Sequence, residues 1–274
     1  MNASLTYSLC TIAVCLIGIT ACAQDTEQAS QPEPTEALTT DEITATEDSF
    51  VAILAGRHKD GWYKSNFSYP SNFYSVGWSA DNIKFASDRV GLFIDSRATE
   101  HHPYSGAEYQ KLGKYGYGRY EAIVKPAAGS GLVSSFFVYT GPYYNDPHHE
   151  VDIEFLGQDT TQMHPNLFVN GKPQNPPTIN LGFDASKSFN LYAFEWEPGR
   201  VVWYVNDQKV LTVEKPVEYM PQFPGLIMAN LWTGSEGQYA WHGKPDFEDG
   251  SNTQYKCISF QAMGDLDAKQ CSDE

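Results

Sequence analysis

Three acidic side chains alternate with apolar ones in the stretch EVDIEFLG, which begins at Glu150. Glu150, Asp152 and Glu154 would share one face of a strand, because successive strand side chains point to opposite faces. The β-branched residues between them favour a strand over a helix. Three like charges on one face repel each other, so the arrangement must serve something other than the stability of a sheet.

Paired carboxyl groups can carry out acid/base chemistry. Crowded carboxyl groups cannot all ionise, so the pKa of one rises while another stays an anion. Cleavage of a glycosidic bond uses such a pair, one as acid and base and the other, in retaining enzymes, as nucleophile. On a flat strand the Cα atoms of Glu150 and Glu154 would lie ~13 Å apart, whereas a retaining pair needs carboxyl groups about 5–5.5 Å apart. The pattern alone therefore also fits a solvated acidic strand.

The surrounding chain is typical of strands and turns. The stretch LYAFEWEPGRVVWYVNDQKVLTVE predicts three strands joined by Pro-Gly and Asn-Asp turns, at 191–196, 200–205 and 208–214. The stretch NLFVNGKP predicts another strand, which ends in a hairpin turn at Asn170-Gly171. No segment has a helical apolar stripe over three turns. We predict an all-β domain of two packed sheets, with a groove on a curved outer face.

Composition limits the partners. The 274 residues carry a net charge of -16, which argues against nucleic acid as a partner. Residues 23–49 hold eight acids and no Lys or Arg. We therefore interpret residues 23–55 as a disordered acidic linker and residues 56–274 as the folded domain, which is only mildly acidic.

The first 22 residues are predicted to be a signal peptide, because the apolar run LCTIAVCLIGITAC is too short to span a membrane. The stretch ITAC resembles the lipobox of bacterial lipoproteins, which implies a lipid on Cys22. No Lys or Arg precedes the run, so an ordinary signal peptide cleaved nearby is the alternative. Ala23, rather than Asp, follows the cysteine, and we expect an exported protein anchored in the outer membrane of a Gram-negative cell.

Two cysteines, Cys257 and Cys271, remain in the mature domain. In an exported protein two cysteines most simply pair. We predict a disulfide that fastens the C-terminal tail to the last strand; the alternative is two free thiols.

Four stretches resemble glycoside hydrolase family 16, most closely its bacterial lichenases, the endo-1,3-1,4-β-glucanases. They are HHEVDIEFLGQDTT, YGYGRYEAIVKPAAGSGLVSSFFVYTGP, LGFDASKSFNLYAFEWEPGRVVWYVN and PGLIMANLWTG, and the resemblance covers roughly residues 62–260. It implies a lectin-like β-jelly-roll sandwich with a substrate cleft on the concave sheet. Laminarinases, agarases and carrageenases of this family usually have one more residue between Asp152 and Glu154. Its absence favours the lichenase and xyloglucan-active branch.

The resemblance implies that Glu150 is the nucleophile, Glu154 the general acid/base and Asp152 their electrostatic helper in retaining hydrolysis. It places five residues where the family binds glucosyl units: Glu108, Asn166, Phe168, Asn230 and Trp232. We add three candidates that would line the cleft: Phe136, Tyr139 and His148. For Phe136, Tyr139 and Trp232, a place in the core is the alternative. Aromatic rings stack on sugar faces, and amides and carboxylates bind hydroxyl groups.

Several positions depart from the lichenase pattern. Gln110 replaces an Arg that holds sugars, His148 replaces a cleft Trp, and Phe168 replaces a Tyr. The preferred glucan is therefore open.

The structural features of lichenases are altered too. Val76 and Gly106 stand in place of the usual disulfide, and Lys256 in place of an Asp that helps to bind a structural calcium. That calcium is therefore doubtful. His148 and His149 point to opposite faces as neighbours on a strand. We predict no cofactor and no metal ligands.

Our leading hypothesis is an exported endo-β-glucanase that hydrolyses mixed-linked 1,3-1,4-β-glucan of the lichenan type. We expect a monomer, because an endo-acting cleft must stay open to a polymer, and membrane contact only through the lipid. The alternatives are a hydrolase or transglycosylase of the same family acting on xyloglucan or another β-glycan, and a surface glycan-binding protein without catalysis. The three intact acids disfavour the last.

Overall fold

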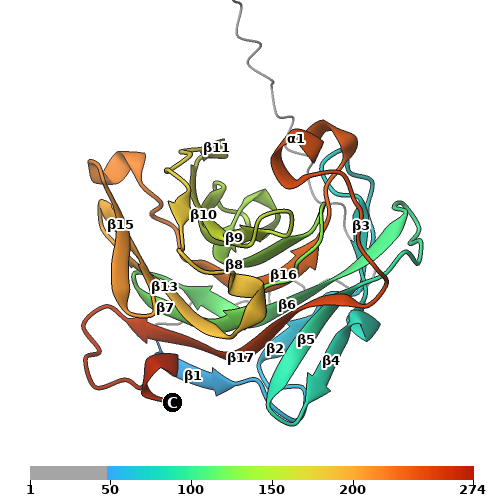
Figure 1. The fold of residues 1–274 in the computed structure, drawn as a ribbon. Helices are drawn as coiled ribbons and strands as arrows, with labels where there is room; N and C mark the ends of the chain where they lie inside the picture. The colour runs from blue at the N-terminus through green and yellow to red at the C-terminus, as the bar shows by residue number, and fades with distance from the viewer. Residues whose placement is uncertain (1–47) are drawn as a thin grey trace, which may run out of the picture.

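The computed structural model describes residues 48–274, which form two stacked β-sheets (Figure 1). The predicted signal peptide, Cys22 and residues 23–47 of the predicted linker lie outside the described residues. Within residues 48–274, no helix has both the length and the hydropathy needed to cross a membrane.

The first sheet, here called the site sheet, has the strand order β11-β10-β9-β8-β16-β6-β2, with β12 paired to β10 and β3 to β6. Its strands are β2 (Trp62–Lys64), β3 (Val76–Trp78), β6 (Tyr104–Tyr115), β8 (Val133–Thr140), β9 (His149–Leu156), β10 (Gln162–Val169), β11 (Lys172–Pro173), β12 (Ile179–Asn180) and β16 (Gly225–Trp232). The sheet curves, and its outer face lies on the inside of the curve (Figure 1).

The second sheet, here called the back sheet, has the order β15-β14-β13-β7-β17-β5-β4, with β1 paired to β17. Its strands are β1 (Phe50–Ile53), β4 (Ile83–Ala86), β5 (Arg89–Ile94), β7 (Gly118–Lys125), β13 (Asn190–Glu197), β14 (Arg200–Val205), β15 (Gln208–Glu214) and β17 (Ser251–Ala262). Within the described residues, the short helix α1 (Tyr239–His242) and five 3-10 turns lie between the strands: η2 (Ala80–Asn82), η3 (Pro142–Tyr144), η4 (Ala185–Lys187), η5 (Val217–Tyr219) and η6 (Glu236–Gln238). Another 3-10 turn, η7 (Cys271–Asp273), follows the last strand.

The predicted run of strands and turns is confirmed at β13, β14 and β15. The second and third strands have the predicted bounds, and β13 is one residue longer at each end. Asn206 and Asp207 have φ of 47° and 60°, which suits a two-residue hairpin loop whose twist matches that of the strands. The local turn residues thus fix the register of this edge of the back sheet.

The core lies between the two sheets and follows the period-two pattern of the strands. Val151, Ile153 and Phe155 of β9 are at most 1% exposed and point into it. Phe155 packs edge-on against Tyr192 of β13, with ring centroids 4.7 Å apart. Burying each such side chain stabilises the fold by about 1.5–3 kcal/mol. Because the apolar side chains of β9 point inward, its acidic ones must point outward.

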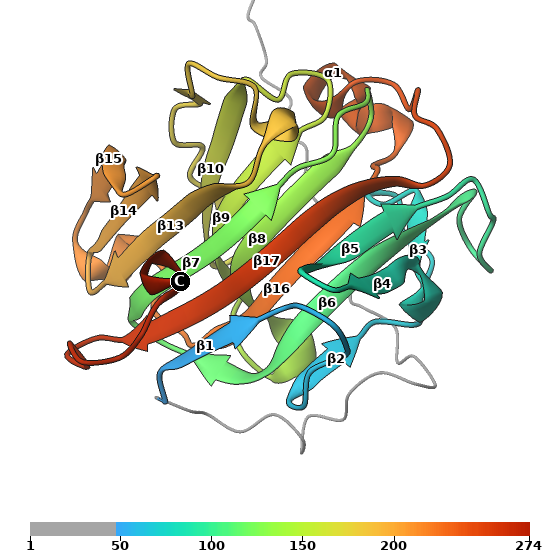
Figure 2. The ribbon, with the colours of Figure 1, turned by 60° about the horizontal axis from the view of Figure 1, so that its bottom comes forward.

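The N-terminal strand β1 corrects the predicted linker. Phe50–Ile53 lies inside the segment expected to be disordered, yet it pairs with β17 from Phe50 opposite Phe260 to Ile53 opposite Cys257 (Figure 2). The Phe50 ring also packs edge-on against Trp62, with ring centroids 6.4 Å apart. This apolar packing and the ladder hydrogen bonds offset the entropy of ordering the strand, so the domain begins by residue 50 rather than 56.

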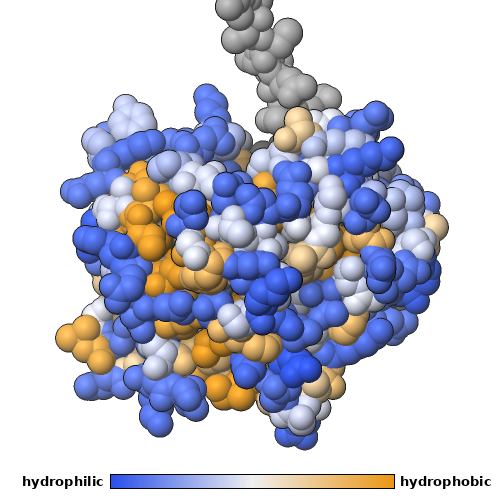
Figure 3. All heavy atoms as spheres, viewed as in Figure 1, coloured by the Kyte–Doolittle hydropathy of each residue, from blue (hydrophilic) through white to orange (hydrophobic). Residues whose placement is uncertain are grey.

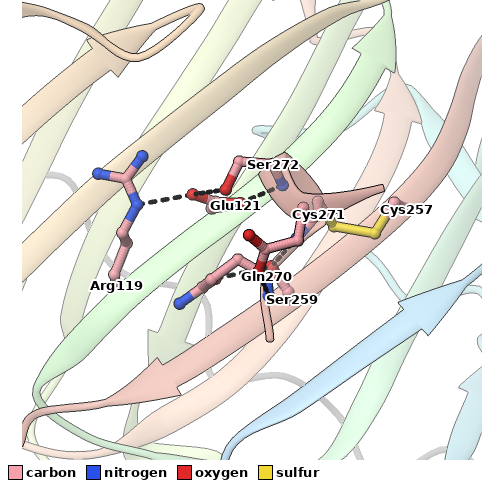
Figure 4. Close-up of a disulfide and its surroundings, with 8 residues drawn as sticks. Arg119, Glu121, Cys257, Ser259, Gln270, Cys271 and Ser272 are labelled. Carbon is pink, nitrogen blue, oxygen red and sulfur yellow. Dashed lines mark hydrogen bonds and ion pairs between the residues drawn. A yellow bond between two sulfur atoms is a disulfide. The ribbon is translucent and has the colours of Figure 1, made fainter. Parts of the chain in front are cut away.

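The C-terminal residues are fastened to the outer face of the back sheet. Cys257 of β17 and Cys271 of η7 form a disulfide (Figure 4). Beside it, the buried carboxylate of Glu121 accepts a hydrogen bond of 2.6 Å from Arg119 Nε and one of 2.9 Å from the main-chain N–H of Ser272. The carboxylate therefore has cationic and main-chain donors that compensate for its burial.

The side of the molecule seen in Figure 1 is mainly hydrophilic (Figure 3). Apolar residues gather on this side around β15, β13 and β10 (Figure 3). Val210, Leu211 and Val213 of β15 are partly buried and pack against the core, so apolar surface at β15 belongs to the margin of the core.

Candidate active site

Strand β9 presents its three acids on the outer face of the site sheet. Asp152 is 3% exposed, the side chain of Glu150 is 16% exposed, and Glu154 is half-buried. Tyr139 of β8 and Phe168 of β10 lie opposite Glu150 in the two flanking ladders. Glu150 therefore has an aromatic residue of a neighbouring strand on each side.

Burial and mutual repulsion separate the protonation states of the acids. Burial, followed by the charges of Glu150 and Glu154, raises the pKa of Asp152 well above its usual value, and Asp152 is hydrogen-bonded to Glu150. Burial and the charge of Glu150 also raise the pKa of Glu154 to about 8. Glu154 therefore carries a proton at neutral pH, as a general acid requires. The crowding of the three acids thus raises the pKa of Glu154, as predicted from their spacing.

Ser135 of β8 is a site residue that sequence reasoning missed. It lies opposite Glu154 in the ladder, and a hydrogen bond between their side chains counteracts the rise in the pKa of Glu154. Its hydroxyl oxygen accepts a hydrogen bond of 3.4 Å from Trp232 Nε1, and its main-chain oxygen accepts one of 2.8 Å from the hydroxyl of Tyr255 in the back sheet. Only the register between β8 and β9 could have revealed this residue.

A second polar cluster forms around Glu108 of β6. The hydroxyl of Ser65 and Nε2 of Gln110 donate to Glu108 Oε1 at 2.8 and 2.7 Å. Burial raises the pKa of Glu108, while hydrogen bonds from Ser65, Gln110 and Asn230 oppose the rise. Within residues 48–274, Oε1 of Gln110 and Oδ1 of Asn230 are buried and accept no hydrogen bond. Both oxygens are therefore acceptors without a donor inside the cluster.

Trp232 of β16 belongs to an aromatic group. It stacks on Phe73 with centroids 5.4 Å apart and rings 28° from parallel, and Trp241 of α1 lies 6.0 Å away. Phe73 is 48% exposed, whereas Trp232 is 4% exposed. The flat surface offered to a ligand is therefore Phe73, with Trp232 beneath it. Sequence reasoning missed Phe73 because it lies in a loop far from Trp232 in the chain.

Tyr139, His148 and Phe168 lie together beside Glu150. The His148 ring stacks on Phe168 with centroids 4.8 Å apart, and Tyr139 meets it edge-on at 5.2 Å. The structure thus places these three candidates against the acids. Asn166 lies opposite Asp152 in the ladder between β9 and β10, but its Oδ1 already accepts from the main-chain N–H of Leu167 at 2.9 Å.

Phe136 is not a surface residue, contrary to the prediction. It is 0% exposed and packs between the sheets, with its ring 5.9 Å from that of Phe194. Its neighbour Phe137 has the opposite parity in β8 and packs with Leu226 and Met228 in a separate apolar cluster. Apolar residues occur on both faces of β8, so this strand lacks the alternation of acidic and apolar residues that marks β9. The prediction therefore put Phe136 on the outer face, where its neighbour Phe137 lies.

His149 has a structural role. It is 2% exposed, its Nδ1 accepts from the main-chain N–H of Gln222 at 3.1 Å, and its Nε2 lies 3.3 Å from Oδ1 of Asn170. Burial lowers its pKa, which favours the neutral ring. These bonds tie the start of β9 to two loops.

One position bears on the structural calcium of lichenases. Among residues 48–274, no group of three or more His, Cys, Asp or Glu side chains is placed to hold an ion. Lys256, at the position expected for a calcium ligand, instead sets its ammonium 4.5 Å from the centroid of the Phe189 ring. A fixed cation repels a second one, so the residues present do not fit that calcium.

A pair of carboxyl groups on one outer face, one of them kept protonated by its surroundings, is the equipment that glycoside hydrolysis uses. The chain belongs to the glycosyl hydrolases family 16, whose sequence profile matches residues 70–255.

Named relatives agree with this family. A β-glucanase of Acetivibrio thermocellus is 37% identical over 81% of this chain, and the chain spans about 65% of the length of that relative. The structure of Bacillus licheniformis β-glucanase is 36% identical with a TM-score of 0.71, covering 77% of this chain and 97% of the other. A β-1,3-1,4-glucanase (lichenase) derived from a mouse hindgut metagenome is 33% identical with a TM-score of 0.73, covering 78% and 99%.

Proposed function

We propose that the protein is a retaining endo-1,3-1,4-β-glucanase that hydrolyses mixed-linked β-glucan. The observation that carries the proposal is the pair Glu150 and Glu154 on one face of β9, with the pKa of Glu154 raised to about 8. The names of the relatives point to the same substrate class.

The reaction would take place in two displacements. Glu150 attacks the anomeric carbon as Glu154 gives its proton to the departing glycosidic oxygen, which leaves a glycosyl ester on Glu150. Glu154, now a base, takes a proton from water as the water oxygen attacks the anomeric carbon, and the ester bond breaks to return the Glu150 carboxylate. Asp152 is hydrogen-bonded to Glu150, and holds that carboxylate in place.

Binding of the polymer would use the Glu108 cluster and Phe73. Phe73 suits a flat glucosyl face, and the Glu108 cluster lies on the same sheet. Oε1 of Gln110 and Oδ1 of Asn230 are buried, so a sugar hydroxyl group would reach them only after these side chains shift. Where lichenases have an Arg, Gln110 has an uncharged amide, so a sugar hydroxyl group at this point would lose the stronger hydrogen bond that a charged donor makes.

The test is a reducing-sugar assay with the purified protein and its Glu150→Gln and Glu154→Gln variants. The panel is barley mixed-linked β-glucan, laminarin, xyloglucan, carboxymethylcellulose and agarose. We expect release from mixed-linked glucan, lost in both variants, and NMR should show the β-anomer first. Activity confined to xyloglucan or agarose would overturn the proposal that mixed-linked β-glucan is the substrate. Glucan binding without release by the wild type would indicate a binding protein.

We further propose that the protein is exported and anchored by a lipid on Cys22, in the outer membrane. The support is the ITAC stretch after the apolar run. Labelled palmitate should enter the wild type in a Gram-negative host and not a Cys22→Ser variant, and the labelled protein should fractionate with outer membranes. Equal labelling of both proteins would contradict the lipid anchor.

We also propose that the protein is a monomer, which size-exclusion chromatography of the soluble chain would check.

A further inference from the structure

His148 contacts the carboxylate that the proposed reaction uses as nucleophile. Its Nε2 lies 2.7 Å from Oε2 of Glu150. The two side chains are 12% and 16% exposed, so water competes little for either group. An N–H donor at this distance from a carboxylate makes a charge-assisted hydrogen bond, about twice as strong as a neutral one.

The position of the His148 ring is fixed from two sides. Phe168 of β10 stacks on one face, with rings 16° from parallel, and Tyr139 of β8 packs edge-on at 63°. Both contacts come from the residues that lie opposite Glu150 in the flanking ladders. The direction of the N–H bond is therefore set by the same strands that set the position of Glu150.

Glu150 thus has a partner on each side along the outer face of β9. His148 precedes it by two residues and Asp152, to which it is also hydrogen-bonded, follows by two. Alternate residues share a face, so the three side chains form a row with the carboxylate in the middle.

We propose that His148 is a positioning residue for Glu150, holding Oε2 as an acceptor and leaving Oε1 to attack the anomeric carbon. The inference rests on the proposed function. When the bond between Oε1 and the anomeric carbon forms, Oε2 becomes the carbonyl oxygen of the ester. When that bond breaks, the electron pair returns to the carboxylate, which His148 again stabilises. No proton leaves His148 in either step.

Two substitutions separate the N–H donor from the ring. His148→Phe keeps an aromatic ring against Phe168 and Tyr139 but has no donor, and His148→Gln keeps an N–H donor but has no ring. With barley mixed-linked β-glucan, we expect His148→Phe to lower kcat by about 10–100-fold while KM changes by less than about 3-fold. His148→Gln should keep kcat within about 5-fold of the wild type. The reverse order of the two variants would overturn the donor role.

A double variant tests whether His148 acts through Glu150. In Glu150→Ala, azide can replace the missing carboxylate and restore part of the rate. We expect His148→Phe to leave this azide-rescued rate within about 2-fold, because residues that act as a unit are not additive. If His148→Phe lowers the azide-rescued rate of Glu150→Ala by the same factor by which it lowers kcat of the wild type, the proposal is overturned.

Different results would overturn the proposed glucanase function and the positioning role of His148. A wild type that releases sugar from none of the five polysaccharides would overturn the proposed function and the inference with it. An active wild type whose kcat is unchanged by His148→Phe would overturn the inference alone. Thermal unfolding of each variant, matched to the wild type within a few degrees, shows that a loss of rate is not a loss of fold.

Discussion

The indole N–H of Trp203 in the back sheet donates a 3.0 Å hydrogen bond to the main-chain oxygen of Asp152 in the site sheet. Trp203 is 0% exposed, so the bond crosses the core. Tyr255 makes a second cross-sheet bond to the main chain of Ser135, the residue paired with Glu154. The back sheet therefore holds both β9, which carries the acids, and β8, which carries Ser135.

Trp203→Phe should weaken the fold and the reaction together. Phe keeps an aromatic ring but removes part of the indole with its N–H, so the Asp152 carbonyl loses this hydrogen bond and the core loses volume. We expect the free energy of unfolding to fall by about 1–3 kcal/mol and kcat to fall as β9 loosens. Trp196→Phe is the matched control, because Trp196 is also buried and donates at 3.0 Å, but to Pro221, outside the site. Denaturant unfolding and glucan kinetics measure both. Equal loss of kcat in the two variants would contradict a specific support of β9.

The rate should depend on pH through Glu154. The general acid works while protonated, so kcat/KM should fall as pH rises through its pKa of about 8. Ser135→Ala removes a hydrogen bond that lowers this pKa, so the alkaline limb should move to higher pH. Ser134→Ala is the control, because the Ser134 hydroxyl accepts from the main-chain N–H of Ala127. A pH–rate profile decides, and a limb that Ser135→Ala leaves in place would contradict the prediction.

Stability should also fall with rising pH. Folding raises the pKa of Glu154 from an ordinary 4.5 to about 8, so the folded state holds this proton more tightly than the unfolded chain. The contribution is fully present below about 4.5 and is lost as pH rises through about 8. Glu154→Gln should therefore flatten the decline in Tm between pH 5 and 8, and the exposed Glu214→Gln should not. Parallel curves for all three proteins would refute this.

Phe73 and Phe136 should respond to truncation in opposite ways. Phe136→Ala leaves a hole in the core, so it should cost about 3–5 kcal/mol of unfolding free energy. Phe73 is 48% exposed and stacks on Trp232, so Phe73→Ala should change stability little and raise KM for glucan several-fold, roughly the worth of one stacking contact. Calorimetry and steady-state kinetics separate the two effects. A stable Phe136→Ala variant with raised KM would restore Phe136 to the binding surface.

The sequence carries enough to predict the class of fold and the acidic strand. Turn pairs such as Asn206-Asp207 mark strand ends through local conformation, and the alternation of acid and apolar residues along β9 reflects one face in the core and one outside. These signals are local, so no tertiary information is needed to interpret them.

Other features depend on which strands pair and in what register. Phe136 and Phe137 are both apolar because β8 is covered on both faces, so composition cannot say which one points to the core. Ser135 and Phe73 gain their roles from Glu154 and Trp232, which lie on other segments. The strand β1 is four residues long beside an acidic segment, and its order comes from β17 rather than from its own composition.

Both ends of the described chain belong to the back sheet, where β1 and η7 contact β17 (Figure 2). The acids lie on the outer face of the other sheet, on β9. A surface or bead coupled to residue 48 or to Glu274 would therefore hold the molecule by its reverse side. The outer face of the site sheet would then stay accessible, so a long polysaccharide could still reach the acids of the immobilised protein. The fold thus provides two attachment points, both on the side opposite the working surface.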